Sequence, residues 1–466
     1  EILRCLVGSE MCIRDSYQSV QAAEADVNIY VAEMRFFRAL EYFNKIQLLG
    51  DVPWLEVDLN VDSEELYGPK MKRNQVFQKI IEDLDFAIQW LPEAGSEEAN
   101  RLNKDIARHV KARFCLNEGT HYKYHDELEY ASEAEKWLQM AATESDKLIT
   151  SGRYEIYNTG HPQEDYFNMY RIDDKSDLKE AVLYVDYKTN ILEHNMAAAG
   201  REAGCGFSKS FVESFLCSDG LPISLSNKYL GDETMRKETA NRDPRLKQLI
   251  LTNDFPTNVT DDLKDSTFVV NEDEFITQHC FTGYRPIKGF NPIYSQALYM
   301  KSSFDGIAYR YAETLLINAE AKAELNTITN ADLDRTVNQL RDRVGMPHLT
   351  VNVGFTDPKW PDWGYSLSPI LQEIRRERCI ELAGEGFRFN DLKRWKAGKV
   401  LNNVLTYVGK RKPDGNLAIV YPNYTNPDLS YQAGKSRTWE DKMYLYPIPT
   451  GELQRNPQLL PQNPGW

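Results

Sequence analysis

The sequence of 466 residues lacks several features that would place it in a common functional class. No stretch approaches the roughly 18 consecutive apolar residues that a membrane-spanning helix needs. There is no Walker-type phosphate loop and no G-x-S-x-G nucleophile turn. No basic stretch is interleaved with aromatic residues, and the net charge of −15 disfavours binding to a nucleic-acid backbone. The seven cysteines form no C-x-x-C pair and no zinc-like spacing with histidine, so we expect neither a metal site nor a cofactor.

The first residues also lack the features of a signal peptide. They contain no long apolar segment and no small-residue cleavage site, and residue 1 is not methionine. The stretch Cys5–Ser16 resembles the translation of a transposon-type sequencing adapter. We therefore predict that residues 1–16 are not native and that the protein's own sequence begins near Tyr17.

Both ends of the chain show the periodicity of amphipathic helices. Apolar residues recur at three- and four-residue spacing, and Gly or Pro follows several of these runs. The predicted helices cover Ser19–Leu49, Asn74–Leu91, Lys104–Gly119, Ala131–Leu148, a segment from Tyr309, Ala331–Val344 and Pro369–Ala383. Paired helices of this length are typical of tetratricopeptide-like arrays, although an irregular helical bundle would show the same pattern. The expected fold class is mainly α.

The middle of the chain, residues 151–302, has a different composition. It is rich in Gly, Pro, Asn and Asp, and short β-like pieces occur at Ala181–Val185 and Thr267–Val270. Irregular segments on a rigid helical scaffold often carry the binding function of a protein. We therefore predict one domain over residues 17–466, with helical scaffold at 17–150 and 303–400 and an irregular, loop-rich ligand-facing region at 151–302.

The densest charged segment, Ile374–Trp395, contains two carboxylates that would share one helix face. Glu377 and Glu381 could form an acid/base pair for glycoside hydrolysis. The same segment supplies matching cations, namely Arg375, Arg378, Arg388 and Arg394. Nearby guanidinium groups lower the pKa of a carboxyl group, whereas a catalytic acid needs a raised pKa. We therefore interpret the pair as part of a structural ion-pair network and predict no catalytic residue.

His121 and His125 also stand four residues apart, a spacing suited to metal ligands on a helix. They follow Gly119, which we expect to end the third helix, and no H-E-x-x-H pattern surrounds them. We predict that both histidines face solvent.

Four segments, taken together, resemble the SusD/RagB family of outer-membrane nutrient-uptake lipoproteins. They are Ala32–Ala39 running to Leu49–Pro53, Arg310–Ala321, Glu377–Trp395, and Tyr446–Pro449 with Asn456–Pro457 and Asn463–Gly465. The resemblance implies a tetratricopeptide-like scaffold and a surface-exposed place in the cell outer membrane. The membrane contact would be an N-terminal lipid anchor, which we expect to be missing from this chain.

The resemblance also implies a function without catalysis. The protein would bind an oligo- or polysaccharide and deliver it to a SusC-like TonB-dependent barrel. Two alternatives come from other classes: an all-α glycoside hydrolase acting on the same glycans, and a cytosolic tetratricopeptide-like scaffold protein.

Exposed aromatic side chains in loops would suit a glycan, because the C–H faces of sugars stack on aromatic rings. The family motifs assign no such positions, so the candidates come from local sequence. Trp360 and Trp363 lie in a Pro/Gly/Asp-rich loop, and Trp54 follows the turn after the first helix. Tyr284 lies in the irregular middle region. We nominate these four residues, together with Tyr67, as ligand-binding.

Overall fold

A computed structural model describes residues 24–56, 59–60, 62–96, 100–199, 206–277, 280–419 and 437–466. These residues form two compact units. Unit 1 contains the described residues up to Leu148 with Lys393–Gly398 and Trp439–Trp466, and unit 2 contains Ile149–Leu392 with Lys399–Thr438. Residues 1–16, predicted to be non-native, lie outside the described part. Within that part, no helix is long and apolar enough to cross a membrane.

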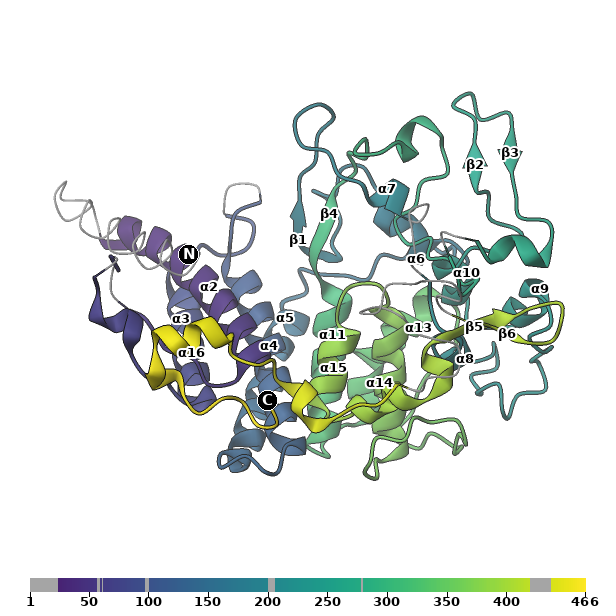
Figure 1. Cartoon of the computed structure of the whole chain (residues 1–466). Helices are drawn as coiled ribbons and strands as arrows, with labels where there is room; N and C mark the ends of the chain where they lie inside the picture. Colours follow the sequence, from purple (N-terminus) through teal and green to yellow (C-terminus); the bar gives the residue numbers. More distant parts are fainter. Residues whose placement is uncertain are drawn as a thin grey trace. The chain divides into compact units, whose positions relative to one another are not determined.

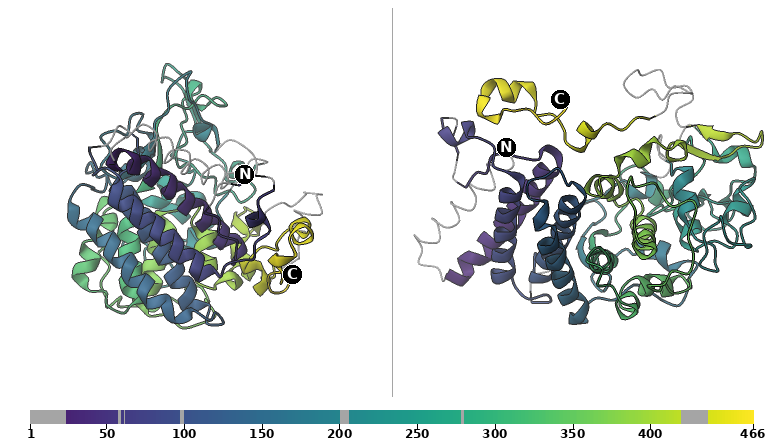
Figure 2. Two further views of the ribbon diagram at one scale, coloured as in Figure 1. Left: turned by 90° about the vertical axis from the view of Figure 1, so that its left-hand side faces the viewer. Right: turned by 90° about the horizontal axis from the view of Figure 1, so that it is seen from below.

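Four long helices dominate unit 1 (Figure 1; Figure 2, left). They are α2 (Glu24–Leu49), α3 (Arg73–Trp90), α4 (Lys104–Tyr124) and α5 (Ala134–Ser151). Helix α3 packs against both α2 and α4. The Phe43 ring of α2 stacks on Phe114 of α4 with centroids 3.6 Å apart, and Phe77 of α3 meets Trp137 of α5 edge-on at 4.8 Å. The four helices predicted for this part of the chain are confirmed within the described residues, and the predicted start at Ser19 lies outside them.

The predicted end of the third helix at Gly119 is wrong, because α4 continues past it. A Cβ atom at Gly119 would lie 2.9 Å from both Cγ and the backbone N of Leu138 on α5, so glycine is needed here for close helix packing rather than for a turn. As a result His121 and His125 are buried, contrary to the prediction. Their rings lie with centroids 4.0 Å apart, and Nε2 of His125 lies 2.9 Å from the carbonyl oxygen of Lys393.

The C-terminal segment packs within unit 1. Its short helices are η8 (Asp441–Tyr444), α16 (Thr450–Arg455) and η9 (Pro457–Leu459). The backbone N–H of Tyr446 donates to the carbonyl of Leu48 at 2.8 Å, and Nδ2 of Asn463 donates to the carbonyl of Leu49 at 2.9 Å. The end of the chain is thereby fixed to the end of α2. A single turn of 3-10 helix, η1 (Glu64–Tyr67), lies in the connection that follows α2.

Unit 2 contains the second set of predicted helices. They are α11 (Tyr311–Glu324), α12 (Asn330–Asp334), α13 (Val337–Arg343) and α14 (Pro369–Glu381). A helix that was not predicted, α15 (Arg388–Arg394), begins in unit 2, and its last two residues belong to unit 1. Helices α11, α13 and α14 pack against one another. The predicted helix Ala331–Val344 is divided into α12 and α13, because the backbone of Thr336 leaves the helical region at φ −130° and ψ −96°.

The rest of unit 2 is irregular. Its short helices in the described residues are α6 (Asp165–Asn168), η3 (Met169–Arg171), α7 (Met196–Ala199), α8 (Lys209–Ser214), α9 (Met235–Thr239), α10 (Arg245–Leu249), η4 (Glu272–Phe275), η5 (Ser295–Ala297), η6 (Gly398–Asn402) and η7 (Val404–Thr406). Antiparallel strand pairs join β1 (Ala181–Val185) to β4 (Gly306–Arg310), β2 (Asn258–Val259) to β3 (Ser266–Thr267), and β5 (Val408–Arg411) to β6 (Leu417–Ile419). The predicted strand Thr267–Val270 is shorter than expected, since β3 ends at Thr267. The mainly α fold class is confirmed.

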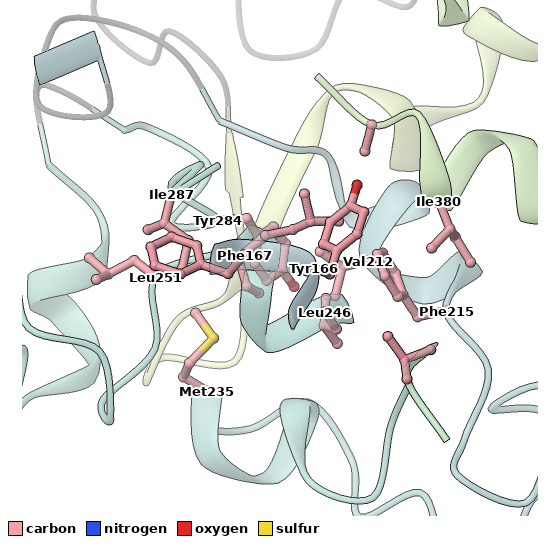
Figure 3. Close-up of a cluster of buried hydrophobic side chains, with 14 of the residues drawn as sticks. Tyr166, Phe167, Val212, Phe215, Met235, Leu246, Leu251, Tyr284, Ile287 and Ile380 are labelled. Atoms are coloured by element: carbon pink, nitrogen blue, oxygen red, sulfur yellow. The ribbon is translucent and has the colours of Figure 1, made fainter. Parts of the chain in front are cut away.

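A buried hydrophobic cluster connects the irregular part of unit 2 to α14 (Figure 3). Tyr166 and Phe167 of α6, Phe215 after α8, and Ile380 of α14 all belong to it. Tyr284 lies in the same cluster and is fully buried. The irregular segments of this unit are therefore anchored by a core of their own. The predicted single domain over residues 17–466, with its internal boundaries, stays a prediction.

Candidate ligand-binding surface

Four of the charged residues singled out in the sequence form buried ion pairs in unit 2, namely Glu377, Glu381, Arg375 and Arg378. Glu381 accepts hydrogen bonds from Arg310 and Arg343 at 2.6 Å and from Arg245 at 3.0 Å. Burial alone would raise the pKa of this carboxyl group, but the three guanidinium groups outweigh burial and hold its pKa well below the usual range. Glu381 is completely buried and ionised, so it suits a structural role and not that of a general acid.

The cations around the two carboxylates come from distant segments. Glu377 pairs with Arg245 at 2.6 Å and with Arg341 at 3.0 Å. Two arginines that we predicted as partners of Glu377 and Glu381 pair with other acids instead. Arg375 pairs with Glu324 and Arg378 with Asp391, each at 3.0 Å. The interpretation as an ion-pair network is confirmed, while most of its members could not be identified from the segment itself.

Two of the five nominated aromatic residues are not exposed. Tyr284 lies within the buried cluster (Figure 3). It has no accessible surface, and its hydroxyl donates to Glu238 at 2.8 Å. Trp363 is 5% exposed, and its Nε1–H donates to Gln372 at 2.6 Å. Each polar group has found a partner inside the fold, which removes the usual cost of burying Tyr or Trp. The expectation that these two rings face solvent is wrong, and neither has a free face for a sugar.

The other three nominees keep some exposure. Trp360 in unit 2 is half-buried, and its Nε1–H donates to Glu373 at 2.7 Å. Trp54 in unit 1 is half-buried, with its ring centroid 4.1 Å from that of Tyr42. Tyr67 of η1 is 49% exposed. A role for these three in ligand binding stays a prediction.

The structure points to aromatic residues that the sequence reasoning missed. Five large apolar side chains are exposed on η5 and its neighbours in unit 2, with Tyr299 71% and Tyr294 53% exposed. We call this group the η5 surface, and it consists of Met196, Tyr294, Leu298, Tyr299 and Met300. Exposed apolar side chains that gather in one part of the chain are better candidates for a binding site than scattered single residues.

Hydrogen bonds to two neighbouring segments fix the backbone of the η5 surface. The N–H of Tyr294 donates to the carbonyl of Val259 in the β2–β3 hairpin at 3.0 Å. The N–H of Met300 donates to Oδ1 of Asn195, just before α7, at 3.1 Å. Helix η5 also packs against α7, and Ala297 between the exposed residues is buried. The two tyrosines are therefore presented by a backbone that is held from both sides, and this lowers the entropy lost on binding.

Polar groups adjoin this apolar surface. Asn291 is buried, and its Nδ2 donates to Oε1 of Gln296, which is exposed on η5. Oδ1 of Asn291 accepts from Nη2 of Arg171 at 3.4 Å. We call Arg171, Asn291 and Gln296 the polar edge. An apolar aromatic face beside a few amide and cationic donors is the composition that a sugar requires, because sugar rings combine C–H faces with hydroxyl groups.

A local signal for the η5 surface was present in the sequence. Tyr294 and Tyr299 stand within Asn291–Met300, a segment with Asn, Pro, Ser and Gln and no regular apolar period. It also falls in the predicted ligand-facing region, residues 151–302. Two tyrosines close together in this region were a stronger signal for an aromatic surface than the single Tyr284.

Comparison with known proteins assigns the chain to a family. A sequence profile of the SusD family matches residues 148–466. The chain belongs to the SusD family. SusD-like protein P2 of Formosa agariphila is 24% identical over 456 residues, which cover 95% of this chain and 75% of the relative. The resemblance seen in the four sequence segments is confirmed.

Solved structures of the SusD family share the fold. A SusD-like protein from Bacteroides fragilis superposes with a TM-score of 0.69 at 24% identity, covering 96% of this chain and 81% of the other. A SusD-like carbohydrate binding protein from the same species has a TM-score of 0.67 at 22% identity, covering 94% and 81%.

Proposed function

We propose that this SusD-family protein binds an oligo- or polysaccharide through the η5 surface. The observation that carries the proposal is the exposure of Tyr294 and Tyr299 on a backbone fixed by hydrogen bonds to Val259 and Asn195. The polar edge beside them supplies donors and acceptors for hydroxyl groups. A relative of the same fold is described as a carbohydrate binding protein, which supports the same ligand class.

The bound glycan is passed, in this proposal, to a SusC-like TonB-dependent barrel at the cell outer membrane, where a lipid anchor holds the protein on the surface. This part rests on membership of the SusD family. The protein is proposed to act without catalysis, and the enclosed, ionised state of Glu381 supports this. Family membership also favours this location over a cytosolic scaffold.

A glycan array followed by isothermal titration calorimetry tests the ligand-binding part. We expect Tyr294→Ala and Tyr299→Ala each to weaken binding about threefold to tenfold, the range for loss of one aromatic contact. Tyr446→Ala, at a tyrosine of similar exposure in unit 1 that was not nominated, is the matched control and should keep wild-type affinity. Tyr67→Ala is measured beside it as the rival site nominated from the sequence. Lost binding in the Tyr67 variant, with both η5 variants unchanged, would transfer the site to the residue nominated from sequence.

A further inference from the structure

Arg171 differs from three exposed lysines in the segments around the η5 surface. Lys188, Lys264 and Lys301 each form an ion pair at 3.0 Å, with Asp186, Asp262 and Glu193 respectively. Arg171 forms no ion pair with any residue that the structure describes. Its hydrogen bond to Asn291 is long, at 3.4 Å, and its buried Nε has no partner. The side chain is half-buried against the Phe167 ring, 5.3 Å from its centroid, so solvent compensates the charge only in part.

Arg171 has no carboxylate of the described residues within ion-pair distance, although the chain has 70 Asp and Glu against 55 Lys and Arg. Burial lowers the pKa of Arg171, and the nearby Asp173 offsets this only in part. Because Nε is buried, the donors left for a ligand are those of the two terminal nitrogens, Nη1 and Nη2. A planar guanidinium binds carboxylate or sulfate oxygens through paired, charge-assisted hydrogen bonds from such groups. The polar edge therefore offers what an anionic group needs, next to the aromatic face that would hold the sugar ring.

We propose that Arg171 makes the η5 surface selective for glycans that carry an anionic group, either a uronate carboxylate or a sulfate ester. This inference rests on the proposed glycan-binding function. The overall charge of −15 does not oppose it at this site, because charges beyond about 8 Å are largely screened at physiological ionic strength. Two acids of the β2–β3 hairpin are held by other groups, since Asp262 pairs with Lys264 and Asp261 accepts from the N–H of Ser295. The acid that acts on Arg171 is the exposed Asp173, which does not reach ion-pair distance.

Two pairs of polymers test the inference and separate the two chemical sources. Oligogalacturonate is compared with its carboxyl-reduced form, and a sulfated galactan is compared with its desulfated form. We expect wild type to bind the acidic member of one pair about tenfold more tightly than its neutral partner, as expected for a hydrogen bond to a charged group. This preference should weaken as salt is added.

Variants assign the preference to Arg171. Arg171→Gln should abolish it, while Arg171→Lys, which keeps the charge but not the planar donor pair, should restore part of it. Arg236→Gln is the control, because it removes one positive charge from an exposed pair with Asp254 in the same unit. It should leave the preference intact.

Equal affinity for the acidic and neutral members in wild type would overturn the inference, as would an unchanged preference in Arg171→Gln. If neutral glycans bind through Tyr294 and Tyr299 without any acidic preference, the inference fails and the proposed function stands. If wild type binds none of the four polymers and no glycan on an array, both fail together.

Discussion

The ion-pair network around Glu381 and the polar edge of the η5 surface use charge in opposite ways. In the network, Glu381 and its three arginines are buried and bonded at 2.6–3.0 Å. At the polar edge, Arg171 has a long bond to Asn291 and no ion pair within the described residues. In the network, charged groups of opposite sign bond to one another. At the polar edge, N–H groups of Arg171 are left for a ligand to accept from. The first arrangement stabilises unit 2, and the second can respond to a ligand.

Breaking the network should have the largest effect. Glu381→Ala leaves Arg245, Arg310 and Arg343 without a shared counter-charge in a buried site. The loss of one partner from a buried ion pair costs about 3–5 kcal/mol, because the remaining charge stays desolvated. We expect a fall of that size in the free energy of unfolding, measured by urea titration. Glycan affinity, measured below the unfolding transition, should change little.

The matched control for this variant is Glu155→Ala, in the same unit. Glu155 pairs with Lys179 at 2.9 Å, and both side chains are at least 60% exposed. An exposed pair of this kind contributes at most about 1 kcal/mol. Abolished binding in Glu381→Ala, at unchanged stability, would contradict the structural assignment.

A second variant pair compares the two tyrosines of unit 2 that differ in burial. Tyr284→Phe removes a hydroxyl that donates to Glu238 at 2.8 Å and accepts from Lys209 at 3.2 Å. Leaving these buried charged groups with one partner fewer should cost about 1–3 kcal/mol of unfolding free energy. Tyr294→Phe removes an exposed hydroxyl and should stay within about 0.5 kcal/mol of wild type. If both variants lost a similar amount of unfolding free energy, the buried hydrogen bonds of the Tyr284 hydroxyl would not contribute the stability that we assign to them.

The elements predicted best were those determined by local periodicity. Helix α3 begins one residue before its predicted start and α14 begins at it, because each helix has its own apolar face and α14 also has a proline as its first residue. The end of α4 was missed because Gly119 serves a contact with Leu138 on a different helix. A glycine needed for packing and a glycine needed for a turn look alike in one sequence.

The candidate surface was harder to predict for a related reason. Tyr284 and Tyr294 belong to the same irregular segment, yet one is in the core and the other in solvent. Their burial depends on partners far along the chain: the Tyr284 hydroxyl meets Glu238, whereas Tyr294 is positioned by the β2–β3 hairpin. Local composition correctly assigned the region as irregular. It could not decide which of its aromatic rings would find a buried partner.

The Trp-rich loop gives the smallest expected effect and separates the two candidate surfaces. The Trp360 Nε1–H donates at 2.7 Å to Glu373, which also pairs with Arg376 at 3.1 Å. Trp360→Phe keeps an aromatic ring but loses this donor, so we expect a stability loss of about 1 kcal/mol, since Arg376 still compensates the carboxylate. If the η5 surface is the binding site, both Trp360→Phe and Trp360→Ala should bind glycan with wild-type affinity in calorimetry. If a sugar instead stacks on Trp360, the Ala variant should lose affinity and the Phe variant should keep most of it, because stacking needs the ring and not the N–H. That pattern would make the Trp-rich loop, and not Tyr294 and Tyr299, the platform of unit 2.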